Sequence, residues 1–70
     1  MSMEQTILIT ELKTLLRRKR LPVTWAGQTL GVSNSQMHRI LDNEAKLNAE
    51  MLHRIQIIIS ALKVLEAIAI

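Results

Sequence analysis

Four polar side chains near the middle of the chain are of types that hydrogen-bond well to the edges of nucleic-acid bases. They are Asn34, Ser35, His38 and Arg39. An Arg side chain can pair with both acceptors of a guanine, and Asn can pair in the same way with adenine. His38 and Arg39 follow one helical turn after Asn34 and Ser35, so a helix would carry all four on its exposed side. The pattern predicts base recognition, with Arg39 as the strongest candidate.

The segment 23–41 that contains these residues is typical of two short helices joined by a tight turn. Gly31 suits the left-handed end of the first helix, and Ser33 with Gln36 forms the Ser-x-x-Gln capping box that begins the second. The apolar residues are spaced so that each helix turns one side toward the other: Ala26, Leu30, Val32, Met37 and Ile40. Two helices joined by a Gly-containing turn form a helix-turn-helix, whose second helix lies in the major groove of DNA.

Helices are also expected on either side of this segment. Residues 5–20 place Leu8, Leu12, Leu15 and Leu16 on one face, and Pro22 ends that helix. The second helix of the pair ends by Asp42-Asn43, where Asn can adopt a left-handed conformation. Residues 44–48 form a linker anchored by Leu47, and Asn48 caps a last helix over 49–70. We therefore expect one all-α domain over residues 1–70.

Composition limits the classes of function. The chain has 70 residues, no cysteine, and 49% hydrophobic residues with a single aromatic one. It contains no Gly-rich phosphate loop and no nucleophile with a partner at a useful spacing, so we expect no enzyme and no cofactor. Its two histidines lack a carboxylate or cysteine at ligand spacing, so no metal site is expected. No leader and no membrane span are recognisable, which favours a cytoplasmic protein with no membrane partner.

The net charge of +3 is unevenly distributed along the chain. Residues 1–41 hold six Lys or Arg against two Glu, whereas residues 42–70 hold three against four acids. The half that contains the helix-turn-helix pattern is therefore the basic half. A basic surface attracts phosphate and is typical of nucleic-acid binders, although a charge of this size also fits ordinary solubility.

The last helix is too apolar to bury only one face. Fourteen of the twenty residues from 51 to 70 are apolar, and at 100° per residue they form two stripes. The first contains Leu52, Ile55, Ile58, Ile59 and Leu62. The second contains Ile57, Ala61, Val64, Leu65 and Ile68. One stripe can pack on the other helices, and the second predicts a two-fold homodimer in which it meets its own copy.

The chain resembles the lambda-repressor and Cro-type helix-turn-helix family over residues 8–62. The resemblance rests on Ala26-Gly27, on the turn Leu30-Gly31-Val32-Ser33, on Met37 and Ile40, and on Leu47-Asn48-Ala49. It implies a fold of four or five helices and a dimeric regulator of the phage or plasmid type, here a repressor of an inverted-repeat operator. The family's roles fall on Asn34, Ser35, His38 and Arg39 as base readers, and on Thr24, Ser33 and Lys46 as phosphate contacts.

Other interpretations stay open at this point. Ser33 and Gln36 could serve only as caps, His38 could be a plain surface residue, and Arg39 could pair with Asp42. The chain as a whole could be a protein-interaction module, such as an antitoxin that binds a partner protein through its last helix. A pure interaction module would not need the base-reading set.

Overall fold

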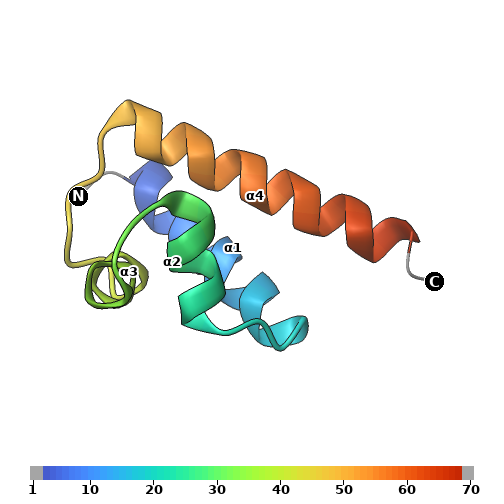
Figure 1. Ribbon diagram of the computed structural model, residues 1–70. Coiled ribbons are helices and arrows are strands. Elements are labelled where there is room, and N and C mark those ends of the chain that lie inside the picture. The colour runs from blue at the N-terminus through green and yellow to red at the C-terminus, as the bar shows by residue number, and fades with distance from the viewer. Residues whose placement is uncertain (1–2, 69–70) are drawn as a thin grey trace.

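The computed structural model describes residues 3–68, which form four helices (Figure 1). They are α1 (Met3–Arg18), α2 (Val23–Leu30), α3 (Asn34–Leu41) and α4 (Ala49–Ile68). No strand occurs in this range, so the expected all-α class is confirmed. α2 begins at the first residue of the segment 23–41 and ends directly before Gly31, as expected, while the last two residues of the helix expected over 49–70 lie outside the described residues.

Three of the helices end in the same way, with a left-handed residue and two backbone hydrogen bonds that close the last turn. The left-handed residues are Arg20, Gly31 and Asn43, with φ of 55°, 78° and 59°. After Gly31, for example, the Val32 N–H donates to the Gly27 carbonyl at 2.9 Å. This pattern satisfies carbonyl groups that the helix itself leaves open. The expectations for Gly31 and Asn43 are confirmed.

The end of α1 differs from the expectation. The helix runs over Met3–Arg18 rather than 5–20, because the chain turns at Arg20 before it reaches Pro22. The Leu21 N–H donates to the Leu16 carbonyl at 2.9 Å, and the Leu21 side chain packs against the core. The left-handed conformation is unfavourable for Arg. It is stabilised here by this hydrogen bond and by the packing of Leu21.

The core is aliphatic and receives residues from all four helices. Its buried members are Ile9, Leu12, Leu15, Leu16, Ala26, Leu30, Met37, Ile40, Leu41, Ile55, Ile58, Ile59 and Leu62. Among the expected core residues, Leu8, Val32 and Leu52 are only half-buried. Ile9 and the polar Gln5 are buried although the sequence pattern did not single them out. Gln5 can be buried because its amide is hydrogen-bonded to the chain that precedes α4.

α4 is the longest helix and packs against α1 and, to a smaller extent, against α2 (Figure 1). Its two apolar stripes separate as expected, because Ile55, Ile58, Ile59 and Leu62 are buried and the second stripe is exposed. Within residues 3–68 no helix is both long enough and apolar enough to cross a bilayer.

Candidate nucleic-acid interface

The start of α3 is fixed by a side-chain cap. Ser33 has an extended backbone, and its hydroxyl oxygen accepts a hydrogen bond from the Gln36 backbone N–H at 3.2 Å. The reverse bond of a full capping box, from the Gln36 side chain to the Ser33 N–H, is not formed among the described residues. The capping role expected of Ser33 is therefore present, and the Gln36 side chain is left for other contacts.

One side of α3 is buried and the other is entirely polar. Met37, Ile40 and Leu41 face the core. The four residues singled out as base readers, Asn34, Ser35, His38 and Arg39, are all exposed, and we call them the α3 outer face. Ser35 and Arg39 are four residues apart, so they lie one above the other on the side opposite the core.

Arg39 has no carboxylate partner within residues 3–68. The ion pairs found there join Arg18 to Glu66, Arg54 to Glu50 and Lys63 to Glu11. The alternative in which Arg39 pairs with Asp42 is therefore not realised. A guanidinium that is exposed and unpaired keeps its donors available to an incoming acceptor.

Gln36 is a further candidate for base contact. The sequence did not predict it, because the Ser-x-x-Gln pattern assigned this residue to capping. Its side chain is exposed and lies at the edge of the α3 outer face. A Gln amide can pair with adenine as Asn does. Its position in the first turn of the helix could have indicated this role, because the N-terminal residues of a recognition helix contact the base edges.

Thr24, Ser33 and Lys46, the three expected phosphate contacts, are all exposed. Thr24 lies in the first turn of α2, Ser33 at the start of α3, and Lys46 in the chain between α3 and α4. The Ser33 hydroxyl oxygen accepts the capping bond, which leaves its O–H free to donate. All three side chains can therefore donate a hydrogen bond toward solvent.

Comparisons with protein-family models, with curated proteins and with solved structures find no match to this chain. Its function is therefore inferred from its own residues.

The second apolar stripe of α4 forms a continuous exposed surface. Its members are Ile57, Ala61, Val64, Leu65 and Ile68, and we call them the α4 outer face. Ile57, Ala61, Val64 and Ile68 follow one another at intervals of four, three and four residues. This is the spacing with which one helix packs along another. A shallow groove of about 280 Å³ between α2 and α4 borders this face at Ile57.

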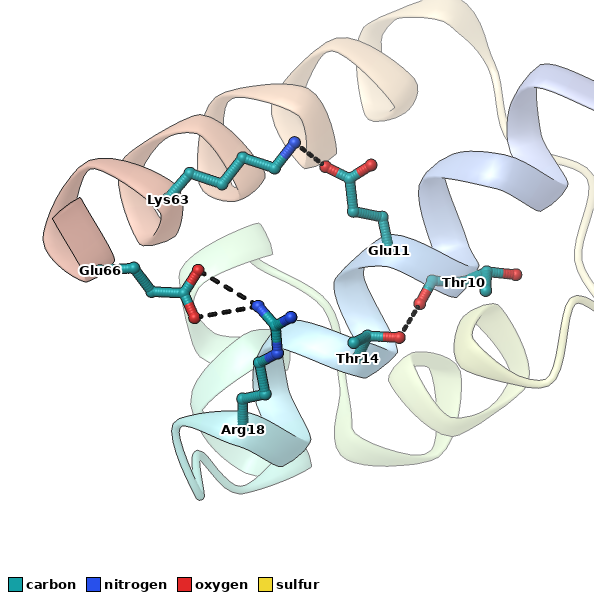
Figure 2. Close-up of polar contacts among 6 residues, drawn as sticks. All are labelled: Thr10, Glu11, Thr14, Arg18, Lys63 and Glu66. Carbon is teal, nitrogen blue, oxygen red and sulfur yellow. Dashed lines mark hydrogen bonds and ion pairs between the residues drawn. The ribbon is translucent and has the colours of Figure 1, made fainter.

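A second groove, of about 520 Å³, lies between α1 and α4. Two ion pairs cross from one helix to the other there: Arg18 with Glu66 at 3.2 Å, and Lys63 with Glu11 (Figure 2). In the same view the Thr14 hydroxyl donates to the Thr10 carbonyl within α1 at 2.9 Å. The polar groups around this groove are thus largely engaged with one another, and they hold the second half of α4 against α1.

Residues 3–68 contain no group of three His, Asp or Glu side chains that could hold a metal ion.

Proposed function

We propose that this protein is a cytoplasmic, sequence-specific DNA-binding regulator of transcription with a lambda-repressor-like fold, acting as a homodimeric repressor. The observation that carries the proposal is the construction of α3. It is a short helix with one buried side, a capped start, and an outer face made only of hydrogen-bonding side chains. In this proposal α2, the turn at Gly31 and α3 act as the helix-turn-helix, and α3 enters the major groove.

Base recognition is assigned to the α3 outer face. Arg39 would pair with a guanine and Asn34 or Gln36 with an adenine, each by two hydrogen bonds. Ser35 and His38 would contact neighbouring base edges. These contacts need side chains that are free of protein partners, and the exposed, unpaired state of Arg39 supports the assignment.

Phosphate contacts are assigned to Thr24, Ser33 and Lys46. Contacts of this kind fix the register of the helix on the duplex, and most of the affinity comes from cations that meet phosphates. Lys46 is the cation of this set, and the excess of Lys and Arg over Glu in residues 1–41 adds only to the general attraction for phosphate.

The dimer contact is assigned to the α4 outer face, which would pack against the same face of a second copy of the chain. Five adjacent apolar residues, exposed on a long helix, are unfavourable in water and are typical of an interface. Because a two-fold axis makes one surface contact its own copy, the regular spacing along α4 suits pairing with a second α4. The two copies of α3 would then reach half-sites about 34 Å apart, and the operator would be an inverted repeat.

The same exposed face of α4 also supports a second candidate function. In an interaction module such as an antitoxin, it would bind a different protein, and DNA binding would be secondary. The molar mass of the purified protein separates the two, since a tight dimer leaves no free face, whereas a monomer that aggregates indicates a missing partner.

Selection from random duplex DNA at near-physiological salt tests the main proposal. We expect enrichment of an inverted repeat with half-sites about one helical turn apart. Binding that is sensitive to salt but shows no enriched sequence would contradict sequence-specific recognition and favour the interaction module.

A further inference from the structure

Gln5 is a polar residue that is almost completely buried, with 2% of its surface exposed. It lies in the first turns of α1 and faces the chain between α3 and α4. Its amide nitrogen donates to the Asn43 side-chain oxygen at 3.0 Å and to the Ala45 carbonyl at 2.7 Å. Its amide oxygen accepts from the Leu47 backbone N–H at 3.0 Å. One side chain therefore holds three alternate residues of a segment that has no regular secondary structure.

Residues 43–48 alternate in exposure along the chain. Asn43, Ala45 and Leu47 are half-buried on the side of Gln5, whereas the residue that follows each of them is exposed: Glu44, Lys46 and Asn48. Hydrogen bonds from Gln5 to the Ala45 carbonyl and from the Leu47 N–H to Gln5 lie on either side of the exposed Lys46, so they restrain the backbone that carries its side chain.

The same network reaches the end of α3. Asn43, the left-handed residue after that helix, receives a hydrogen bond from Gln5 and donates one from its own amide to the Thr6 hydroxyl at 3.1 Å. The Glu44 N–H closes the last turn of α3 by donating to the Arg39 carbonyl at 2.9 Å. The start of α1 is therefore connected, through Asn43, to the turn that carries Arg39.

We propose that Gln5 is a positioning residue for DNA binding, which fixes residues 43–47 in the conformation that presents Lys46 beside the end of α3. Ordering this segment before DNA arrives removes the entropy loss that a loose segment would suffer on binding. This inference rests on the proposed function, because it gives Gln5 a role in the phosphate contact assigned to Lys46.

The first test measures the order of the segment without DNA. Gln5→Met keeps the length of the side chain and removes its hydrogen bonds. We expect hydrogen exchange at the Leu47 amide to accelerate by about tenfold or more relative to amides in the middle of α4. Gln28→Met, the same change at an exposed position of α2, is the control and should leave Leu47 unchanged. If Gln5→Met does not fold, Asn43→Gly replaces it, because Gly keeps the left-handed turn but removes one partner of Gln5.

The second test measures DNA binding in a double-mutant cycle. In the native background, Lys46→Ala should make the negative slope of log K against log salt shallower, reducing its magnitude by about 1. In the Gln5→Met background the same change should reduce the magnitude much less, because Lys46 is no longer held in place. The inference would be overturned if Lys46→Ala reduced the salt slope equally in the two backgrounds, or if Gln5→Met left the exchange rate of the Leu47 amide unchanged. If the native protein binds no DNA, the proposed function fails instead, and Leu47 exchange alone decides whether Gln5 orders the segment.

Discussion

Ile57 and Ile58 are neighbours in the chain and chemically identical, yet Ile58 is 8% exposed and Ile57 is 55% exposed. Successive residues of a helix are rotated by about 100°, so Ile58 packs into the core while Ile57 begins the α4 outer face. The same residue type thus stands in two environments on one helix. Ile58 stabilises the fold by its burial, and Ile57 remains exposed.

Leu65→Asp places a charge on the α4 outer face. We expect the dimer dissociation constant to rise by about tenfold or more, because an unpaired carboxylate would be buried between the copies. Operator affinity should fall with it. Sedimentation equilibrium measures the first effect, and titration of labelled operator DNA measures the second.

Ser60→Asp is the matched control, since Ser60 is an exposed residue of α4 outside this face. It should remain dimeric. A Leu65→Asp protein that is dimeric with native affinity would show that the α4 outer face is not the interface.

Arg39→Ala should relax specificity at one base pair in each half-site, at a cost of about 1–3 kcal/mol for the preferred base. Lys46→Ala, by contrast, should weaken binding to all sequences by a similar factor, because a phosphate contact does not distinguish bases. Binding to a set of operators that differ at single positions measures both. A uniform loss with Arg39→Ala would identify Arg39 as a phosphate contact.

Gly31→Ala should lower the free energy of unfolding by about 1–2 kcal/mol. Gly31 has a φ of 78°, and a side chain at this position is strained although no atom lies within 4 Å of its added Cβ. Denaturant unfolding followed by circular dichroism measures the loss. Gly31→Asn should lose less, because Asn tolerates the left-handed region better. Equal losses for Ala and Asn would mean that the strain is not the cause.

Gly27→Ala tests the close approach of α2 to the turn and to α3. An added Cβ would lie 3.2 Å from the Val32 carbonyl oxygen and 3.4 Å from the Met37 Cβ. Since Val32 can yield only by moving its backbone, we expect a loss of about 1–3 kcal/mol in stability. Operator affinity should also fall at temperatures where the protein is fully folded, because α3 is displaced. Gln28→Ala, at the next and exposed position, should change neither quantity.

Glu66→Gln removes the ion pair with Arg18 that joins α4 to α1 (Figure 2). Both side chains are partly exposed, so we expect a change in unfolding free energy of less than about 1 kcal/mol. Thermal unfolding at low and high salt measures it, and the difference between native and variant should shrink at high salt. A difference that is large and independent of salt would mean that Glu66 acts through packing instead.

Local patterns in the sequence were sufficient to predict much of the helical architecture. The bounds of α2, the cap at Ser33 and the left-handed turns at Gly31 and Asn43 follow from preferences of single residues and their immediate neighbours. The division of α4 into a buried and an exposed stripe follows from the helical period alone. The same period placed Asn34, Ser35, His38 and Arg39 on the side of α3 away from its apolar residues.

Tertiary structure decided the features that depend on residues far apart in the chain. Gln5 and Asn43 are 38 positions apart, and no local preference indicates that a glutamine at the start of a helix becomes buried against a segment that follows another helix. The early end of α1 at Arg18 has the same origin, because the left-handed Arg20 is stabilised by where Leu21 packs. Sequence periodicity determined which side of each helix is apolar. Only the packing of the helices determined which polar groups are buried together, because that depends on distances between elements that their own sequences do not encode.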